Sequence, residues 1–159
     1  MNLSTRTFLL SWRPKHRLSG QIADYIRNYQ PSEELPFRHW NCGVSKTMRE
    51  GDRVLLFRNG GENPGMIGSG WANGGAYRDQ HFDPKFHDFK SNFVDVRVEA
   101  LLPFDQSISF EQLNKDLDSE TLSNARMSGS IIPPHEAMKL EQLWKAYLTK
   151  YEVVMNKEQ

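Results

Sequence analysis

The chain has 159 residues, 38% of them apolar, and its 20 basic and 20 acidic side chains give a net charge of zero. This composition is typical of one globular domain, leaves no room for two, and argues against a generic polyanion binder. The single cysteine, Cys42, excludes an intramolecular disulfide. The first residues lack the long apolar run of a signal peptide or membrane span, so we expect a cytoplasmic protein without a membrane partner.

The net charge of zero hides an uneven distribution of charge along the chain. Residues 1–60 carry ten Lys and Arg against five Asp and Glu, a net charge of +5, and residues 61–159 carry −5. If the first sixty residues line one face, that face attracts phosphate. If the charges intermix in the folded molecule, no such face exists, and the sequence leaves both possibilities open.

Hydrophobic patterning predicts strands and helices in an unequal distribution along the chain. Short apolar or alternating runs predict strands over 6–12, 38–43, 53–57, 66–72 and 93–102. Helical spacing predicts helices over 18–29, 110–117 and 134–151, the second opened by a capping box of Ser109 and Gln112. Residues 74–92 show no period and are predicted to be a long loop. Because strands and helices do not alternate, we expect a single α+β domain with a curled mixed sheet and flanking helices.

Two glycines support the curled sheet. Gly68 and Gly70 lie on one face of the strand over 66–72, where a glycine favours strong bending or a second backbone passing close by. Both are features of a small sheet that closes into a barrel.

No arrangement of catalytic residues is present. The GMIGSG segment precedes no helix and lacks a following Lys-Ser/Thr, so it is not a nucleotide-binding loop. We therefore predict no catalytic residue, no cofactor and no metal site. An enzyme that uses zinc or iron remains an alternative, because potential ligands gather in the loop at Asp79, His81, Asp83, His87 and Asp88, although their spacing matches no known pattern. Cys42 is expected to be a buried, inert thiol.

Aromatic and basic side chains interleave at two places. Trp12 is followed directly by Arg13, and Trp40 follows Arg38 and His39. A Trp at a strand end can stack on a nucleobase, which contributes about 1–3 kcal/mol of binding free energy. Arg and Lys side chains nearby can bind the flanking phosphates. The alternative for both rings is a place in the core, which we also expect for Trp144.

Eight segments in order resemble a known family. TRTFLLSWRP, WNCG, REGDRVLLFRNG, PGMIGSGW, HFDP, FVDVRVEALL, SG-x-IIP and LEQLW together resemble an EVE domain of the PUA-like superfamily, in the variety found at the N-terminus of modified-cytosine-dependent HNH restriction endonucleases. The resemblance implies a barrel-like sheet with flanking helices and a pocket for a modified base, similar to YTH domains. It implies a reader of the base and not a nuclease. We place the domain at residues 1–155, with a polar tail over 156–159.

The resemblance also assigns the pocket. Its implied members are Ser11, Trp12, Trp40, Asn41, Cys42, Gly43, Arg58, Asn59 and Ser128. We predict that the phosphates flanking the base are bound by Arg13, Lys15, Arg17 and Arg38. Relatives often carry an aromatic residue and a Gln before the SG motif, where this chain has Ser123 and Arg126, so the lid of the pocket differs here.

The predicted function is a non-catalytic module that flips a modified base, in first place a modified cytosine in DNA, into a pocket between Trp12 and Trp40. A buried methyl contributes only about 0.8 kcal/mol, so selectivity must come from hydrogen bonds to the base edge. Two alternatives stay open: a PUA-like protein that binds modified or structured RNA, and an adaptor for a separate nuclease or helicase.

Overall fold

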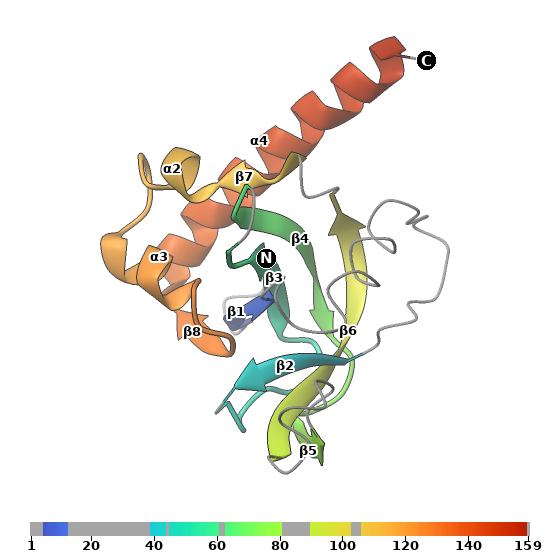
Figure 1. Cartoon of the computed structure of the whole chain (residues 1–159), viewed down its shortest axis with the longest axis vertical. Coiled ribbons are helices and arrows are strands. Elements are labelled where there is room, and N and C mark those ends of the chain that lie inside the picture. The colour runs from blue at the N-terminus through green and yellow to red at the C-terminus, as the bar shows by residue number, and fades with distance from the viewer. Residues whose placement is uncertain are drawn as a thin grey trace.

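The structure is a computed structural model that describes residues 5–12, 39–43, 45–60, 63–80, 90–102 and 106–158. Within these ranges a mixed sheet of eight strands curls until it nearly closes into a barrel, flanked by helices (Figure 1). The strands are β1 (Thr7–Trp12), β2 (His39–Gly43), β3 (Arg53–Arg58), β4 (Gly65–Ala72), β5 (Tyr77–Gln80), β6 (Lys90–Leu101), β7 (Ile108–Ser109) and β8 (Ser130–Ile132). The helices are α2 (Phe110–Leu113), α3 (Ser119–Asn124) and α4 (Pro134–Glu158). The expected α+β class and single domain are confirmed.

β1 and β3 form a parallel pair, with β4 on the far side of β3 and the edge strand β8 on the far side of β1. Leu9 pairs with Leu55 in this register. Alternate side chains of the two strands enter two different cores, so the strands are buried on both faces. The barrel interior receives Phe8, Leu10, Val54 and Leu56, whereas Leu9, Leu55 and Phe57 pack in the core that includes α4. This two-sided burial explains the continuous apolar run that predicts a strand at 53–57.

β4 bends as it passes between its antiparallel neighbours β3 and β6. A Cβ on Gly70 would lie 2.4 Å from the carbonyl oxygen of Arg97, which is closer than real Cβ contacts allow. The register with β6 shifts between Ser69 and Gly70. The close backbone approach predicted from the two glycines of this strand is therefore confirmed.

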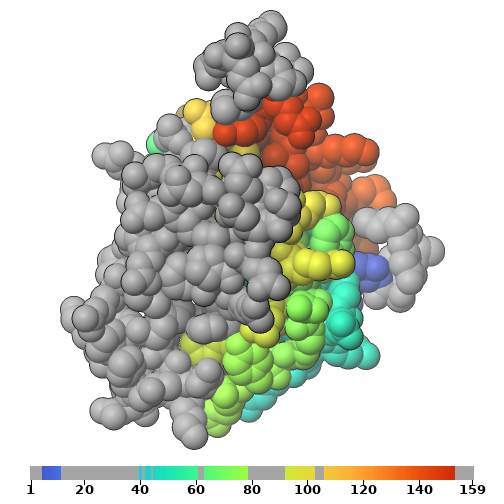
Figure 2. Space-filling model, turned by 90° about the vertical axis from the view of Figure 1, so that its right-hand side faces the viewer, coloured from blue at the N-terminus to red at the C-terminus, as the bar shows by residue number. Residues whose placement is uncertain are grey.

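Helix α4 is fixed to the sheet by apolar packing and by a polar network. Trp144 is buried in the core beside Leu140, and its indole N–H donates to Ser69 Oγ at 2.8 Å. Arg53 donates two hydrogen bonds to Glu141 on α4, at 2.6 and 3.1 Å, and a third to Glu99 at 2.9 Å. Figure 2 shows β4 and β6 side by side with α4 above them.

Some elements differ from the sequence-based expectation. The predicted loop over 74–92 contains β5 and the start of β6, and α3 is a helix that the patterning does not predict. The strand β8 before the last helix agrees with the optional strand that the sequence predicts there. The capping box at Ser109 and Gln112 is present, but the helix that it opens ends at Leu113. Helix α4 continues to Glu158, so it includes residues 156–158 of the expected tail. The predicted helix over 18–29 lies outside the described residues. Among the described helices, none has the length and apolar character needed to cross a membrane.

Candidate functional site

The carboxyl ends of β1 and β3 form the centre of the candidate site. Because the two strands are parallel, these ends lie at the same edge of the sheet, where Ser11 pairs with Phe57 and Trp12 with Arg58. Asn59 follows directly after β3. The sequence-predicted members from these two segments are therefore brought together.

A turn formed by residues 126–129, called here the 126–129 turn, fastens these strand ends together. Ser128 Oγ accepts a hydrogen bond from the backbone N–H of Ser11 at 3.1 Å. The N–H of Gly129 donates to the carbonyl oxygen of Leu9 at 2.8 Å. Asn59 Nδ2 donates to the carbonyl oxygen of Arg126 at 2.6 Å. The turn thus connects the ends of β1 and β3, with its bond to Ser11 spanning 117 residues of chain and its bond to Asn59 spanning 67.

The end of β2 meets the same turn at very short range. Gly129 has a φ of +95°, and a Cβ there would lie 1.9 Å from the carbonyl oxygen of Cys42. Gly43 has a φ of +61°, and its Cβ would lie 2.5 Å from the carbonyl oxygen of Ser128. Only glycine fits such a conformation at such a distance. The structure therefore brings Ser11, Gly43, Asn59 and Ser128 together at one end of the barrel.

Trp40 lies in the interior of the barrel. Its side chain is 8% exposed and packs in the cluster that contains Phe8, Leu10 and Cys42. Within the described part of the chain, its indole N–H has no hydrogen-bond acceptor. The ring is thus placed deep under the candidate site and not on open surface. The side chains of Trp12 and Asn41 lie outside the description, so the aromatic pocket stays a prediction.

Two other predicted pocket residues are buried. Cys42 is 0% exposed, and its Sγ donates to the carbonyl oxygen of Ser45 at 3.6 Å. Burial raises the pKa of the Cys42 thiol to about 11, so it is not a nucleophile at neutral pH. The side chain of Arg58 is buried, with 6% exposure, so it is a part of the interior and not a surface cation.

The predicted phosphate-binding residues Arg13, Lys15, Arg17 and Arg38 all lie outside the described residues, as do His81 and His87 of the alternative metal site. Their assignments stay predictions. The phosphate-binding set also omits Arg126, an exposed arginine beside the site, which the sequence analysis mentions only in connection with the lid of the pocket.

A hollow between α2 and α3 lies next to the 126–129 turn, and we call it the α2–α3 hollow. It has a volume of about 420 Å³ and is lined by Phe110, Glu111, Asn114, Ser119, Leu122, Ser123 and Arg126. The guanidinium of Arg126 lies over the Phe110 ring, 4.4 Å from its centroid. Ser123 and Arg126, the two residues before the SG motif that the sequence analysis singles out, both line this hollow.

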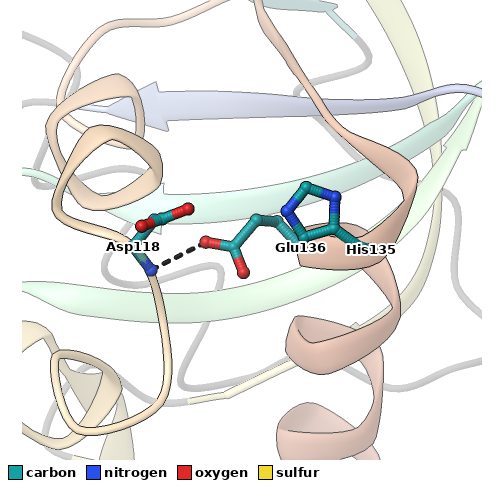
Figure 3. Close-up of side chains that lie close together, drawn as sticks. All are labelled: Asp118, His135 and Glu136. Carbon is teal, nitrogen blue, oxygen red and sulfur yellow. Dashed lines mark hydrogen bonds between the residues drawn. The ribbon is translucent and has the colours of Figure 1, made fainter.

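Asp118, His135 and Glu136 form a group whose potential metal-ligating atoms lie within 4.8 Å of one another. Figure 3 shows Glu136 reaching from the start of α4 to the backbone nitrogen of Asp118, at 2.7 Å. The same oxygen accepts from Thr121 Oγ1 at 2.9 Å, and the other oxygen faces Lys139 Nζ at 3.3 Å. Oε1 therefore accepts two hydrogen bonds and Oε2 has an ion-pair contact, and we interpret Glu136 as a structural link between α3 and α4.

Comparisons with known proteins agree with this architecture. The family model of the EVE domain matches residues 25–143. A Pseudomonas syringae protein, PSPTO5229, is 16% identical, with a TM-score of 0.55, and the match covers 86% of this chain and 98% of that chain. The DUF55 domain of human thymocyte nuclear protein 1 is also 16% identical, with a TM-score of 0.50 and coverage of 86% and 95%.

A third structure is human THYN1 protein in complex with 5-methylcytosine-containing DNA, at 15% identity and a TM-score of 0.49, with coverage of 87% of this chain and 97% of that chain. No curated protein matches the chain. The first two likenesses show a shared fold, and the family match spans most of the sequence. The chain belongs to the EVE domain family.

Proposed function

We propose that this chain is a non-catalytic module that binds nucleic acid and takes a modified base, in first place a modified cytosine in DNA, into a pocket at the ends of β1, β2 and β3. The observation that carries the proposal is the meeting of Ser11, Gly43, Asn59 and Ser128 at one end of the barrel. Membership of the EVE family and the sequence resemblance to modified-cytosine-reading domains support it.

Asn59 is suited to read the base edge. Its Nδ2 is held by the carbonyl oxygen of Arg126 at 2.6 Å, which fixes the amide and leaves Oδ1 as the acceptor for a ligand. Cytosine presents an amino donor at position 4, whereas thymine presents an acceptor there. We therefore expect Oδ1 to favour cytosine, because thymine would leave two acceptors facing each other.

The buried indole N–H of Trp40 supports the same end of the barrel as a binding place. A buried donor without an acceptor costs about 1–3 kcal/mol. In the described residues this donor is unsatisfied beneath the strand ends. A base carbonyl or ring nitrogen that enters the pocket would supply the missing acceptor.

The test is a binding titration by fluorescence anisotropy. Labelled DNA duplexes carry 5-methylcytosine, cytosine or thymine at one central position, and an RNA of the same sequence is measured beside them. We expect 5-methylcytosine to bind most tightly, and the Asn59→Ala variant to lose about tenfold in discrimination between cytosine and thymine. Asn73→Ala, which changes an exposed asparagine between β4 and β5, is the matched control.

Two results would overturn this function. One is equal affinity for modified and unmodified oligonucleotides, and the other is no binding of any of them. Tighter binding of the RNA would assign the same site to RNA, as in the alternative that the sequence leaves open.

A further inference from the structure

The α2–α3 hollow is continuous with the proposed base site through Arg126. The carbonyl oxygen of Arg126 holds Asn59, and two residues later Ser128 holds the N–H of Ser11. The side chain of the same Arg126 lines the hollow. A ligand group in the hollow would therefore lie on the side of the 126–129 turn next to the strand ends.

Arg126 offers its charge to solvent. It is exposed, and its guanidinium is positioned by the Phe110 ring, which itself stacks on Phe57 with centroids 5.9 Å apart. Arg6, which also lies over an aromatic ring, that of Phe8, is by contrast paired with Asp52 at 2.7 Å. Among the described residues Arg126 has no carboxylate partner. An oriented, unneutralised guanidinium is well suited to a phosphate, which it can bind with two parallel hydrogen bonds.

Besides the apolar Phe110 and Leu122, the remaining lining of the hollow is polar and mostly neutral. Asn114, Ser119 and Ser123 supply an amide and two hydroxyl groups, which are common partners of sugar and phosphate oxygens. One acidic residue, Glu111, also lines the hollow and would oppose an anion. Glu111 therefore provides a test of opposite sign to that of Arg126.

We propose that the α2–α3 hollow binds the backbone phosphate of a nucleotide next to the flipped base, with Arg126 as its cationic partner. This inference rests on the proposed function, because it assumes that a nucleic acid occupies the strand ends.

The experiment measures the salt dependence of binding to the 5-methylcytosine duplex between 50 and 200 mM NaCl. One phosphate contact contributes about 0.9 to the slope of log K against log salt. Arg126→Gln should weaken binding about tenfold at 50 mM and lower the slope by about 0.9, so that the deficit shrinks about 3.5-fold by 200 mM. The ratio of modified to unmodified affinity should stay the same, because a phosphate contact carries no base information.

Arg97→Gln is the matched control. Arg97 is also exposed and also lies over an aromatic ring, that of Trp71, at 5.3 Å, but it is on β6 and does not line the hollow. It should leave both affinity and slope unchanged. Arg126→Lys should keep the slope, since the charge remains. Circular dichroism of each variant verifies that the fold is intact.

A second pair of variants tests whether removing a negative charge at the hollow strengthens binding. Glu111→Gln should tighten binding about threefold at 50 mM NaCl, whereas Glu120→Gln, an exposed acid of α3 outside the hollow, should have a smaller effect. If wild type binds but Arg126→Gln keeps its slope, the phosphate site is refuted and the base-reading function stands. If Arg126→Lys loses as much as Arg126→Gln, the hollow holds a stacked group and not a phosphate. If wild type binds no oligonucleotide, both proposals fall.

Discussion

The contact between Gly129 and the end of β2 predicts an unusually sensitive position. In Gly129→Ala the new Cβ would lie 1.9 Å from the carbonyl oxygen of Cys42, 2.8 Å from its carbonyl carbon and 3.1 Å from Ser45 Cβ. Real Cβ atoms essentially never come closer than 3.0 Å to such atoms, so the two backbones must separate by about 1 Å. The hydrogen bond from Gly129 N–H to Leu9, at 2.8 Å, would be stretched by the same movement.

Gly51→Ala is a control that isolates this contact. Gly51 has a φ of +90°, close to the +95° of Gly129, but no atom lies within 4 Å of its Cβ position. Both variants carry the cost of a side chain at positive φ, about 1–2 kcal/mol. Only Gly129→Ala adds overpacking and a weakened hydrogen bond, which together destabilise by about 2–4 kcal/mol.

The measurement is equilibrium unfolding in urea, followed by tryptophan fluorescence. We expect Gly129→Ala to lose about 2–4 kcal/mol more unfolding free energy than Gly51→Ala, with a similar m-value. If Gly129→Ala is too unstable to measure, Gly43→Ala has the longer approach of 2.5 Å and should give an intermediate loss. Equal losses for Gly129→Ala and Gly51→Ala would refute the tight crossing of β2 and the 126–129 turn.

Three further predictions follow from buried polar groups. Glu141→Gln removes the carboxylate to which Arg53 donates two hydrogen bonds, and should lower the free energy of unfolding in urea by about 2 kcal/mol. The Glu99 side chain is 39% exposed, so Glu99→Gln should cost less. A smaller loss for Glu141→Gln than for Glu99→Gln would contradict the hydrogen bonds described for Arg53. Burial raises the pKa of Glu136, but hydrogen bonds from Asp118 N–H, Thr121 and Lys139 outweigh it and hold the pKa below its ordinary value of 4.5. Its stabilisation is therefore present above pH 4.5 and lost as pH falls further, so Glu136→Gln should differ from wild type at pH 7 and approach it in acid, in unfolding curves measured across pH. Cys42, with a pKa raised to about 11, should resist iodoacetamide at pH 8 in the native protein and react after unfolding, as read by mass spectrometry; native labelling at the rate of a free thiol would contradict its burial.

The elements that the sequence predicts well are those with a strong burial pattern. β3 shows one continuous apolar run because both of its faces are covered, and α4 places Ala137, Leu140 and Trp144 on one helical face. The capping box at Ser109 is local chemistry and is equally visible. Short elements such as β5 and α3 carry no period long enough to detect, so they appear only in the structure.

The site was harder to predict because it is made of contacts between distant segments. No sequence pattern predicts the parallel pairing of β1 and β3. None predicts the hydrogen bond from Ser11 to Ser128 either, because these residues are 117 apart in the chain. The resemblance to a family supplied that grouping. The sequence did contain a signal for the interior position of Trp40. Cys42 is apolar and comes two residues later, so both side chains lie on the same face of β2 and enter the same core. Arg126 gave no such signal, because its orientation beside the site depends on the Phe110 ring over which its guanidinium lies.

The pairing of β8 with β1 has a consequence for the order of events during synthesis. β1 is completed at residue 12, but the partner that covers its outer edge is at 130–132. Contacts of such long sequence separation form late, because a large loop must close first. The barrel therefore cannot be completed on a ribosome until β8 has emerged, and fragments that stop before it should fold poorly.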